Sequence, residues 1–133
     1  MEERDLQEKV AVYRVLEARL EAAIKQRDSI ASRIVEMQAV KESIGELEKS
    51  DDVIFPVGSD VFAFGKIAEK KKVMVAVGAG VIMEKSIAEA KEILDKRREG
   101  MEQVMKEVQG NIEKVSSTLE QLGSEIQSTM EQA

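Results

Sequence analysis

The residue types that most often do chemistry in proteins are largely missing from this chain of 133 residues, which contains no histidine and no cysteine. The missing imidazole removes the usual general base near neutral pH and the commonest ligand of transition metals. The missing thiol removes cysteine nucleophiles, disulfides and sulfur-bound zinc. Carboxylates remain available, but this composition argues against an enzyme, and we predict no catalytic and no metal-binding residues.

One glycine-rich stretch, Val77-Gly78-Ala79-Gly80, is a candidate for phosphate binding. A phosphate-binding P-loop has a longer glycine-rich loop that ends in a lysine and joins a strand to a helix. Here the glycines separate two runs of β-branched residues, so the stretch reads as a turn between strands. We therefore expect no nucleotide and no other cofactor.

The charge balance narrows the possible partners and the location. The net charge is −6, which disfavours nonspecific binding to nucleic acid or to an anionic membrane. The longest apolar run, residues 73–83, is too short to span a bilayer. The first residues, MEERDLQEKV, are charged throughout and unlike a signal peptide. A cytoplasmic protein is expected.

Two long segments carry the heptad spacing of a coiled coil, in which apolar residues recur at alternating steps of three and four. In residues 3–49 the seam positions are apolar except for Arg27 and Lys41. In residues 86–130 the seam runs from Met101 to Ile126 without a miss. The apolar seam positions are Tyr13, Leu16, Leu20, Ala23, Ile30, Ile34, Met37 and Ile44, followed by Met101, Met105, Val108, Ile112, Val115, Leu119, Leu122 and Ile126.

If the chain folds back at its middle, the two seams match as an antiparallel coiled coil. Tyr13 then faces Leu122 and Ala23 faces Ile112, and every a position meets a d position. Helices of this length, about 70 Å, need such a partner to bury their apolar stripes.

The two charged seam positions allow two interpretations. Arg27 would face Val108, and Lys41 would face Leu94. Their aliphatic stems can cover the seam while the charges reach water. Alternatively, they fix the register of the coil at some cost in stability.

The middle of the chain is predicted to form two β-hairpins. DVIFPVGSDVFAFGKI and KKVMVAVGAGVIMEKS each contain two β-branched or aromatic runs around a glycine-bearing turn. Pro56 marks an edge position or a bulge, because it cannot donate to a ladder. Ser86 followed by Glu89 is a capping box that begins a helix. The expected organisation is a coiled-coil helix over residues 1–50, the hairpins over 51–85 and a second coiled-coil helix over 86–133.

Four short strands cannot bury the apolar side chains that these hairpins carry. The exposed edges of so small a sheet also invite pairing with other chains. We therefore expect the hairpins to join the strands of neighbouring subunits into a barrel or sandwich, and a self-contained β tip on a monomer is the alternative. The predicted assembly residues are Val53, Ile54, Phe55, Val57, Phe62, Phe64, Val73, Val75, Val77 and Val81.

Taken together, these residues resemble the α subunits of prefoldin, a co-chaperone. The specific strings are Pro56-Val57-Gly58, the VGAGV turn at 77–81 and the Glu-Lys-Ser sequence that leads into the second helix. Two hairpins rather than one indicate the α class. The family often has a second glycine where this chain has Asp60, although aspartate also tolerates left-handed backbone. The resemblance implies a mainly α fold with a small β part, in which a long antiparallel coiled coil carries two central hairpins that join a multi-subunit β-barrel.

The resemblance also implies a function. The chain would be a subunit of a heterohexamer of two α and four β subunits, and it would hold unfolded client proteins at the coil tips without ATP. The clients would then pass to a group II chaperonin. A structural filament or tether is the alternative, because a relative that assembles into filaments is known.

The predicted client-binding residues lie near both ends of the chain, which the folded-back arrangement brings together at the free tip of the coil. Helix ends fray, and a frayed coil exposes adaptable apolar side chains. Gly110 and Gly123, assigned to outward positions, would weaken the helix there. Alternatively, these apolar residues only close the last heptads. The set is Leu6, Val10, Val12, Tyr13, Leu119, Leu122, Ile126 and Met130.

Overall fold

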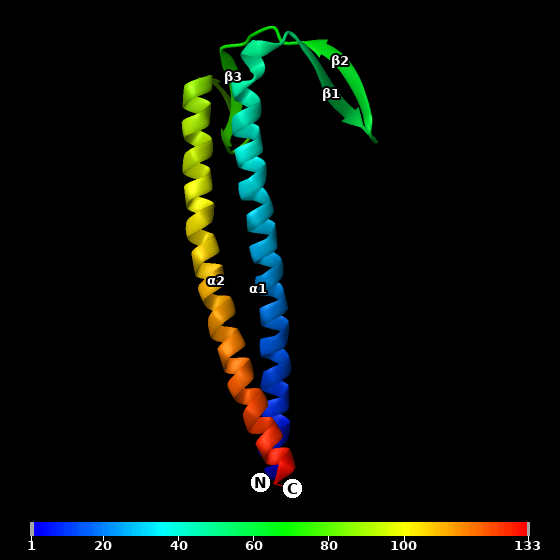
Figure 1. Cartoon of the computed structure of the whole chain (residues 1–133), viewed down its shortest axis with the longest axis vertical. Helices are drawn as coiled ribbons and strands as arrows, with labels where there is room; N and C mark the ends of the chain where they lie inside the picture. The colour runs from blue at the N-terminus through cyan, green and yellow to red at the C-terminus, as the bar shows by residue number, and fades with distance from the viewer. Residues whose placement is uncertain (1, 133) are drawn as a thin grey trace. The chain divides into compact units, whose positions relative to one another are not determined.

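The computed structural model describes residues 2–132 and contains two long helices separated by two β-hairpins (Figure 1). The prediction of a mainly α fold with two central hairpins is therefore confirmed. The elements are α1 (Glu2–Gly45), the short 3₁₀ helix η1 (Leu47–Lys49), β1 (Asp52–Gly58), β2 (Val61–Lys66), β3 (Lys72–Gly78), β4 (Val81–Ser86) and α2 (Ile87–Glu131).

The chain divides into two compact units. Residues 1–33 and 101–133 form the first, which we call the coil unit, and residues 34–100 form the second, which we call the hairpin unit. Each helix contributes a segment to both units.

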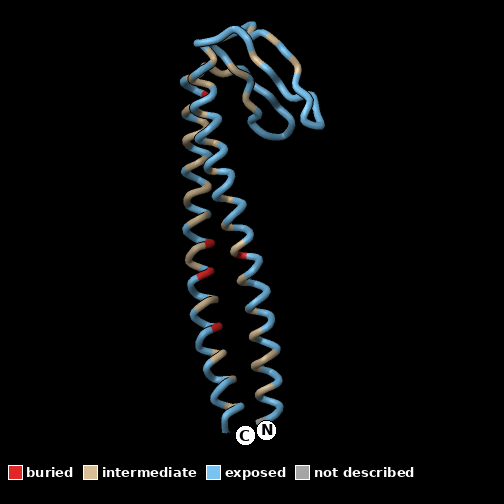
Figure 2. The backbone as a smooth tube through the Cα atoms, turned by 45° about the vertical axis from the view of Figure 1, so that its right-hand side comes forward, coloured by how far each residue is buried: buried red, intermediate tan, exposed pale blue. Residues whose placement is uncertain are grey.

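The coil unit consists of two antiparallel helical segments that pack along one seam (Figure 2). Ala23, Val108 and Ile112 are buried together, and Leu20 and Ile30 are among the half-buried residues packed against them. All the predicted seam positions of this unit are buried or half-buried. The shared cluster of Ala23 and Ile112 agrees with the predicted antiparallel register.

The two hairpins have the same backbone plan. Within the described residues, β1 pairs only with β2 and β3 only with β4, both antiparallel. Pro56 lies opposite Phe62 just before a register shift in the first hairpin, and Ala76 lies opposite Ile82 just before the equivalent shift in the second. Pro56 therefore lies beside a β-bulge, in agreement with the sequence interpretation.

The turns of both hairpins use left-handed backbone, as predicted. The two residues between β1 and β2 are Ser59 and Asp60, with φ of 50° and 63°. Ala79 and Gly80 take the same places between β3 and β4, with φ of 51° and 75°. Positive φ at both central residues is the requirement of a type I′ hairpin turn. Asp60 thus fulfils the conformational role for which the family often uses glycine.

The predicted capping box begins α2. The Glu89 backbone N–H donates to Ser86 Oγ at 3.1 Å, and the Ser86 N–H donates to Glu89 Oε1 at 3.3 Å. These bonds satisfy two backbone donors at the point where β4 becomes a helix. The hydrogen bonds from Ser86 lower the pKa of the Glu89 carboxyl group, because they favour its ionised form.

Candidate assembly and client-binding surfaces

The first hairpin presents apolar side chains to solvent on one face of its sheet. Ile54, Phe62 and Phe64 alternate with other residues along β1 and β2, and all three are exposed, with Phe64 90% accessible. On the other face the Phe55 ring lies over Gly65, where an added Cβ would be 3.0 Å from Cε1 of the ring. The predicted assembly residues of this hairpin are thus largely unburied within the chain.

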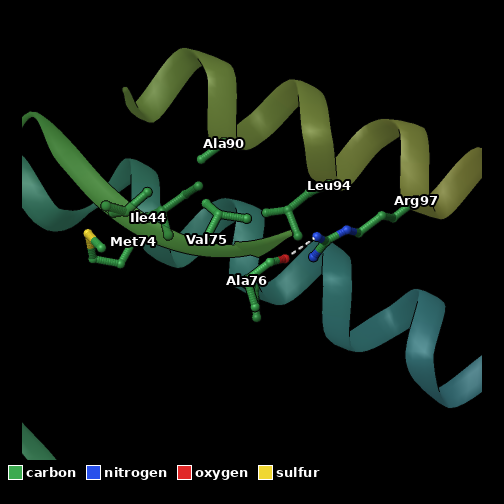
Figure 3. Close-up of a pocket in the computed structure, with 9 residues that line it drawn as sticks. Ile44, Met74, Val75, Ala76, Ala90, Leu94 and Arg97 are labelled. Carbon is green, nitrogen blue, oxygen red and sulfur yellow. Dashed lines mark hydrogen bonds between the residues drawn. The ribbon is translucent and has the colours of Figure 1, made fainter. Parts of the chain in front are cut away.

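The second hairpin packs one of its faces against the helical segments of the hairpin unit. Val73 and Val75 are half-buried and line a cavity of about 210 Å³ whose walls include Ile44, Ala90 and Leu94 (Figure 3). Of the predicted assembly residues, Val73 and Val75 therefore contact their own helices, whereas Val77 and Val81 are exposed.

A side chain of α2 also forms a hydrogen bond with the backbone of the second hairpin. Arg97 Nη2 donates a hydrogen bond of 2.5 Å to the carbonyl oxygen of Ala76 on β3 (Figure 3). This contact could not be predicted from the sequence, because a surface arginine in a helix carries no signal for a backbone carbonyl on a separate strand.

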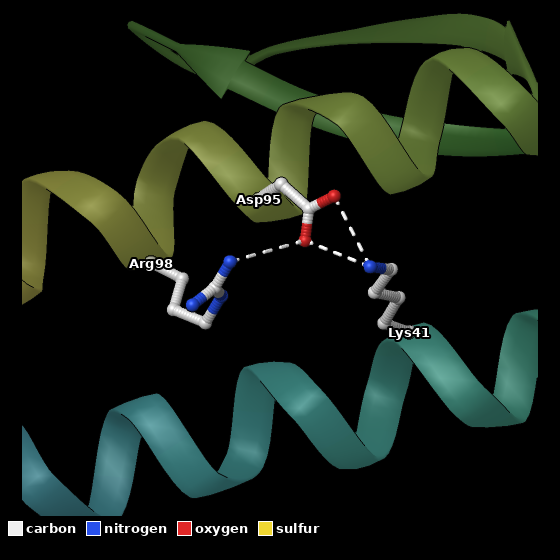
Figure 4. Close-up of polar contacts among 3 residues, drawn as sticks. All are labelled: Lys41, Asp95 and Arg98. Carbon is white, nitrogen blue, oxygen red and sulfur yellow. Dashed lines mark hydrogen bonds and ion pairs between the residues drawn. The ribbon is translucent and has the colours of Figure 1, made fainter.

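The charged seam position Lys41 makes an ion pair between the two helices of the hairpin unit. Its Nζ donates to both carboxylate oxygens of Asp95, at 2.9 and 3.1 Å, and Arg98 Nη2 lies 3.7 Å from the same carboxylate (Figure 4). The hydrogen bond from Lys41 lowers the pKa of Asp95. Lys41 thus reaches past the expected neighbour Leu94 to an acid that the heptad pattern did not mark. Arg27, by contrast, pairs with Asp28 of its own helix at 3.3 Å.

The predicted client-binding residues gather on the coil unit but differ in exposure. Leu119 is buried, and Val12 and Met130 are 51% and 62% exposed. The remaining five, which are half-buried, are Leu6, Val10, Tyr13, Leu122 and Ile126. Their role in binding clients remains a prediction.

Two open recesses bring several of these residues together. One, of about 390 Å³, is lined by Val10, Tyr13 and Ile126, together with Gly123 and two charged residues. The other, of about 300 Å³, is lined by Leu6, Val10, Ala11 and the stems of two polar residues. The ion pair between Lys9 and Glu125, at 3.8 Å, ties the same stretch of α1 to α2.

The assignment of Gly123 to an outward position is wrong. Gly123 is half-buried, and a Cβ added there would lie 3.6 Å from Cε2 of Tyr13. The glycine leaves room beside the Tyr13 ring, which is why it lines the larger recess. The heptad count missed this because a large ring extends beyond its own seam position.

Two kinds of feature are absent from residues 2–132. They contain no group of three or more acidic side chains that could hold a metal ion. Neither helix in this range has an apolar stretch long enough to cross a membrane.

Comparison with known proteins identifies the family of this architecture. A family model described as prefoldin subunit matches residues 16–132. The chain belongs to the prefoldin family. Its relatives include prefoldin subunit alpha of Archaeoglobus fulgidus, with 30% identity over 94% of this chain and 88% of the relative. Prefoldin subunit alpha of Pyrococcus horikoshii is 26% identical over 93% of this chain and 86% of the relative.

A solved structure has the same fold as this prefoldin chain. A chain in the cryo-EM structure of filamentous PFD from Methanocaldococcus jannaschii aligns with a TM-score of 0.75. The alignment covers 86% of this chain and 98% of that chain, at 19% sequence identity. The resemblance to prefoldin α subunits, first based on the two turn strings and the capped start of α2, is therefore confirmed.

Proposed function

We propose that this prefoldin chain is a non-catalytic subunit of a cytoplasmic chaperone that holds unfolded proteins without ATP and delivers them to a group II chaperonin. The observation that carries the proposal is the presence of two kinds of exposed apolar surface. One lies on two small sheets in the hairpin unit, and the other lies along the helices of the coil unit.

The sheets supply the assembly surface in this proposal. Ile54, Phe62 and Phe64 are exposed on the first hairpin, and Met74 and Ile82 are exposed on the second. Two-stranded sheets with apolar faces are marginal in water unless further strands or helices cover them. Strands from prefoldin β subunits, in a hexamer of two α and four β subunits, would provide this cover.

The coil unit supplies the client-binding surface. Val12, Val15 and Met130 are more than half exposed, and they lie on the same helical segments as the two open recesses. Unfolded proteins present varied apolar segments, and a shallow surface of flexible aliphatic and methionine side chains can adapt to them. No nucleotide is needed for binding of this kind, because burial of apolar area is itself favourable.

The proposal is tested with the complex formed by co-expressing this chain and a candidate β subunit. Val12→Ser combined with Met130→Ser removes exposed apolar side chains of the coil unit, and Val35→Ser is the matched control at a 68% exposed position of the hairpin unit. Light scattering then follows the aggregation of a chemically denatured client, and native mass spectrometry checks the assembly.

We expect both variants to assemble and only the double variant to lose protection of the client. Deletion of residues 1–12 together with 124–133 should have the same effect in a stronger form. Full protection by the truncated complex would overturn the proposed client surface. A chain that remains a folded monomer beside its β subunits would overturn the proposed assembly.

A structural filament is the second candidate, and the arrangement of the sheets favours it. The described residues form two separate two-stranded sheets, so one copy presents two sheets, rather than one, for contact with neighbours. Contacts of this head-to-tail kind form open filaments when the rotation between copies does not close. Negative-stain microscopy of the chain alone, and then with a β subunit, distinguishes fibres from discrete particles.

A further inference from the structure

The cavity between the second hairpin and its helices is larger than the voids that protein interiors usually leave. Its volume is about 210 Å³, and its walls come from the end of α1, from β3 and from the start of α2. Well-packed interiors have few voids larger than a water molecule. Of the residues in these walls only Ala90 is buried. The apolar wall residues that remain half-buried are Ile44, Val73, Val75 and Leu94.

The lining of the cavity is apolar apart from one cationic group. Val40 and Met74 complete the aliphatic walls, and Arg97 is the single charged residue in the lining. No aspartate, glutamate, serine or threonine lines the cavity. The space therefore combines an apolar surface with one positive charge and offers no second polar side chain.

The guanidinium group of Arg97 has hydrogen-bond donors to spare. Its Nη2 donates to the Ala76 carbonyl oxygen at 2.5 Å, whereas a guanidinium group carries five N–H donors in a planar fork. Among residues 2–132 no carboxylate pairs with Arg97. The nearby acid in the sequence, Asp95, accepts hydrogen bonds from Lys41 instead. A free carboxylate suits such a fork, because it can accept two parallel hydrogen bonds.

The charge lies at one end of the apolar space. Figure 3 shows Arg97 beside Ala76 at one end of the β3 segment and Met74 at the other end, with Val75 between them. An apolar cavity of about 150 Å³ accommodates a benzene molecule, so this larger cavity has room for about six to eight carbon atoms. The molecule that matches this shape has a short apolar chain and a negative group at one end.

We propose that this cavity is a binding site for a monocarboxylate with an apolar chain of about six to eight carbon atoms. The carboxylate pairs with Arg97 at the Ala76 end, and the chain lies along Val75 toward Met74. Arg97 keeps its hydrogen bond to Ala76, because the carboxylate uses other N–H groups of the fork. The bound molecule then adds apolar contacts between the second hairpin and the two helices.

Other occupants fit the lining less well. A peptide segment, whether from a client or from another subunit, brings backbone N–H and carbonyl groups into the cavity. Burying these groups without partners is unfavourable, and Arg97 is the only lining side chain that could bond to them. A nucleotide is too polar for walls of this kind. An uncharged apolar molecule would fill the space but leave the donors of Arg97 unused.

Octanoate is the probe for this site, and octanol and acetate are its matched controls. Octanol has the chain without the charge, and acetate has the charge without the chain. Isothermal titration calorimetry of the full chain measures the three affinities. NMR of methionine methyl groups locates the ligand, because Met74 lines the cavity, whereas Met101 and Met105 belong to the coil unit.

We expect octanoate to bind about tenfold more tightly than octanol, because its charged group accepts hydrogen bonds from Arg97. Each methylene added between hexanoate and octanoate should strengthen binding about fourfold, and acetate should show no saturable binding. The methyl signal of Met74 should shift with octanoate, and those of Met101 and Met105 should not. Equal affinities for octanoate and octanol would overturn the carboxylate assignment. Saturable binding that leaves the Met74 signal unmoved would overturn the site.

A pair of variants tests the role of the guanidinium group. Arg97→Gln removes the charge, and Arg19→Gln makes the same change at an exposed position of the coil unit. Octanoate should bind Arg97→Gln about tenfold more weakly, while octanol binds as before and Arg19→Gln behaves like the unaltered chain. Equal weakening of octanoate and octanol by Arg97→Gln, or the same weakening by Arg19→Gln, would overturn the role of Arg97.

The same titration of the complex with β subunits tests the competing occupant. If a side chain of a neighbouring subunit fills the cavity, octanoate no longer binds the complex, and that result also overturns the proposal. Assembly and client protection enter none of these outcomes. A failure at this cavity therefore leaves the proposed chaperone function untouched.

Discussion

Replacement of Ile112 by alanine is the most direct test of the seam that holds the coil unit together. Ile112 is 7% exposed and lies in one cluster with Ala23 and Val108. The substitution removes three carbon atoms, and each buried methylene contributes about 0.8 kcal/mol. Because neighbours collapse only partly into the space, we expect a loss of about 2–3 kcal/mol in the free energy of unfolding.

Val15→Ala is the matched control on the outer face of α1. Val15 is 54% exposed, so its truncation loses little burial, and alanine gains about 0.5 kcal/mol of helix propensity over valine. The two terms nearly cancel, and the net change should stay below about 0.5 kcal/mol. Urea unfolding followed by circular dichroism at 222 nm, at one fixed protein concentration, measures both variants.

The outcome that refutes this reasoning is an equal effect of the two substitutions. If Ile112→Ala and Val15→Ala shift the urea midpoint alike, the buried cluster does not stabilise the coil unit. A change in the slope of the transition would instead report a change in the surface exposed on unfolding. Only a midpoint shift at constant slope supports the seam.

Three further predictions concern single contacts. The folded-state pKa of Asp95 is lowered, so its ion pair with Lys41 stabilises the fold fully at pH values above the ordinary aspartate pKa. This stabilisation is lost as the pH falls through the lowered pKa. Asp95→Asn should therefore flatten the pH dependence of the urea midpoint in that range. Ser86→Ala removes the helix cap and should cost about 1 kcal/mol of unfolding free energy; an unchanged urea midpoint would contradict this. Gly123→Ala places a Cβ in ordinary contact with the Tyr13 ring and should raise the free energy of unfolding by up to about 1 kcal/mol. A lower midpoint of thermal unfolding would contradict this.

The parts of this structure that depend on periodicity could be predicted from the sequence. The coil-unit seam, the positive-φ hairpin turns and the capping box all follow from residue types at fixed local spacing, and each is present. The antiparallel register also followed, because two independent heptads had to match along their length. Such signals are local or repeated many times, so single exceptions such as Arg27 do not obscure them.

The contacts between separate elements could not be predicted in this way. Arg97 reaches the Ala76 carbonyl and Lys41 reaches Asp95 only because a strand and two helices come together in the hairpin unit. Each contact uses a long charged side chain whose target is a single polar group on another element. No spacing along the chain encodes that target. Nor does any spacing predict that Gly123 leaves room beside the Tyr13 ring.

The two hairpins show how one backbone plan can serve two purposes. Their ladders are equivalent residue by residue, yet the position of Phe64 in the first is taken by Glu84 in the second, where it pairs with Lys72 at 3.7 Å. The second hairpin buries Val75 against its own helices and is fixed by Arg97, so its apolar face is partly used within the chain. In the first hairpin the position equivalent to Ala76 is occupied by Pro56. An exposed aromatic face is unfavourable in water unless it is covered, so the first hairpin depends more on a partner for the burial of its apolar side chains than the second does.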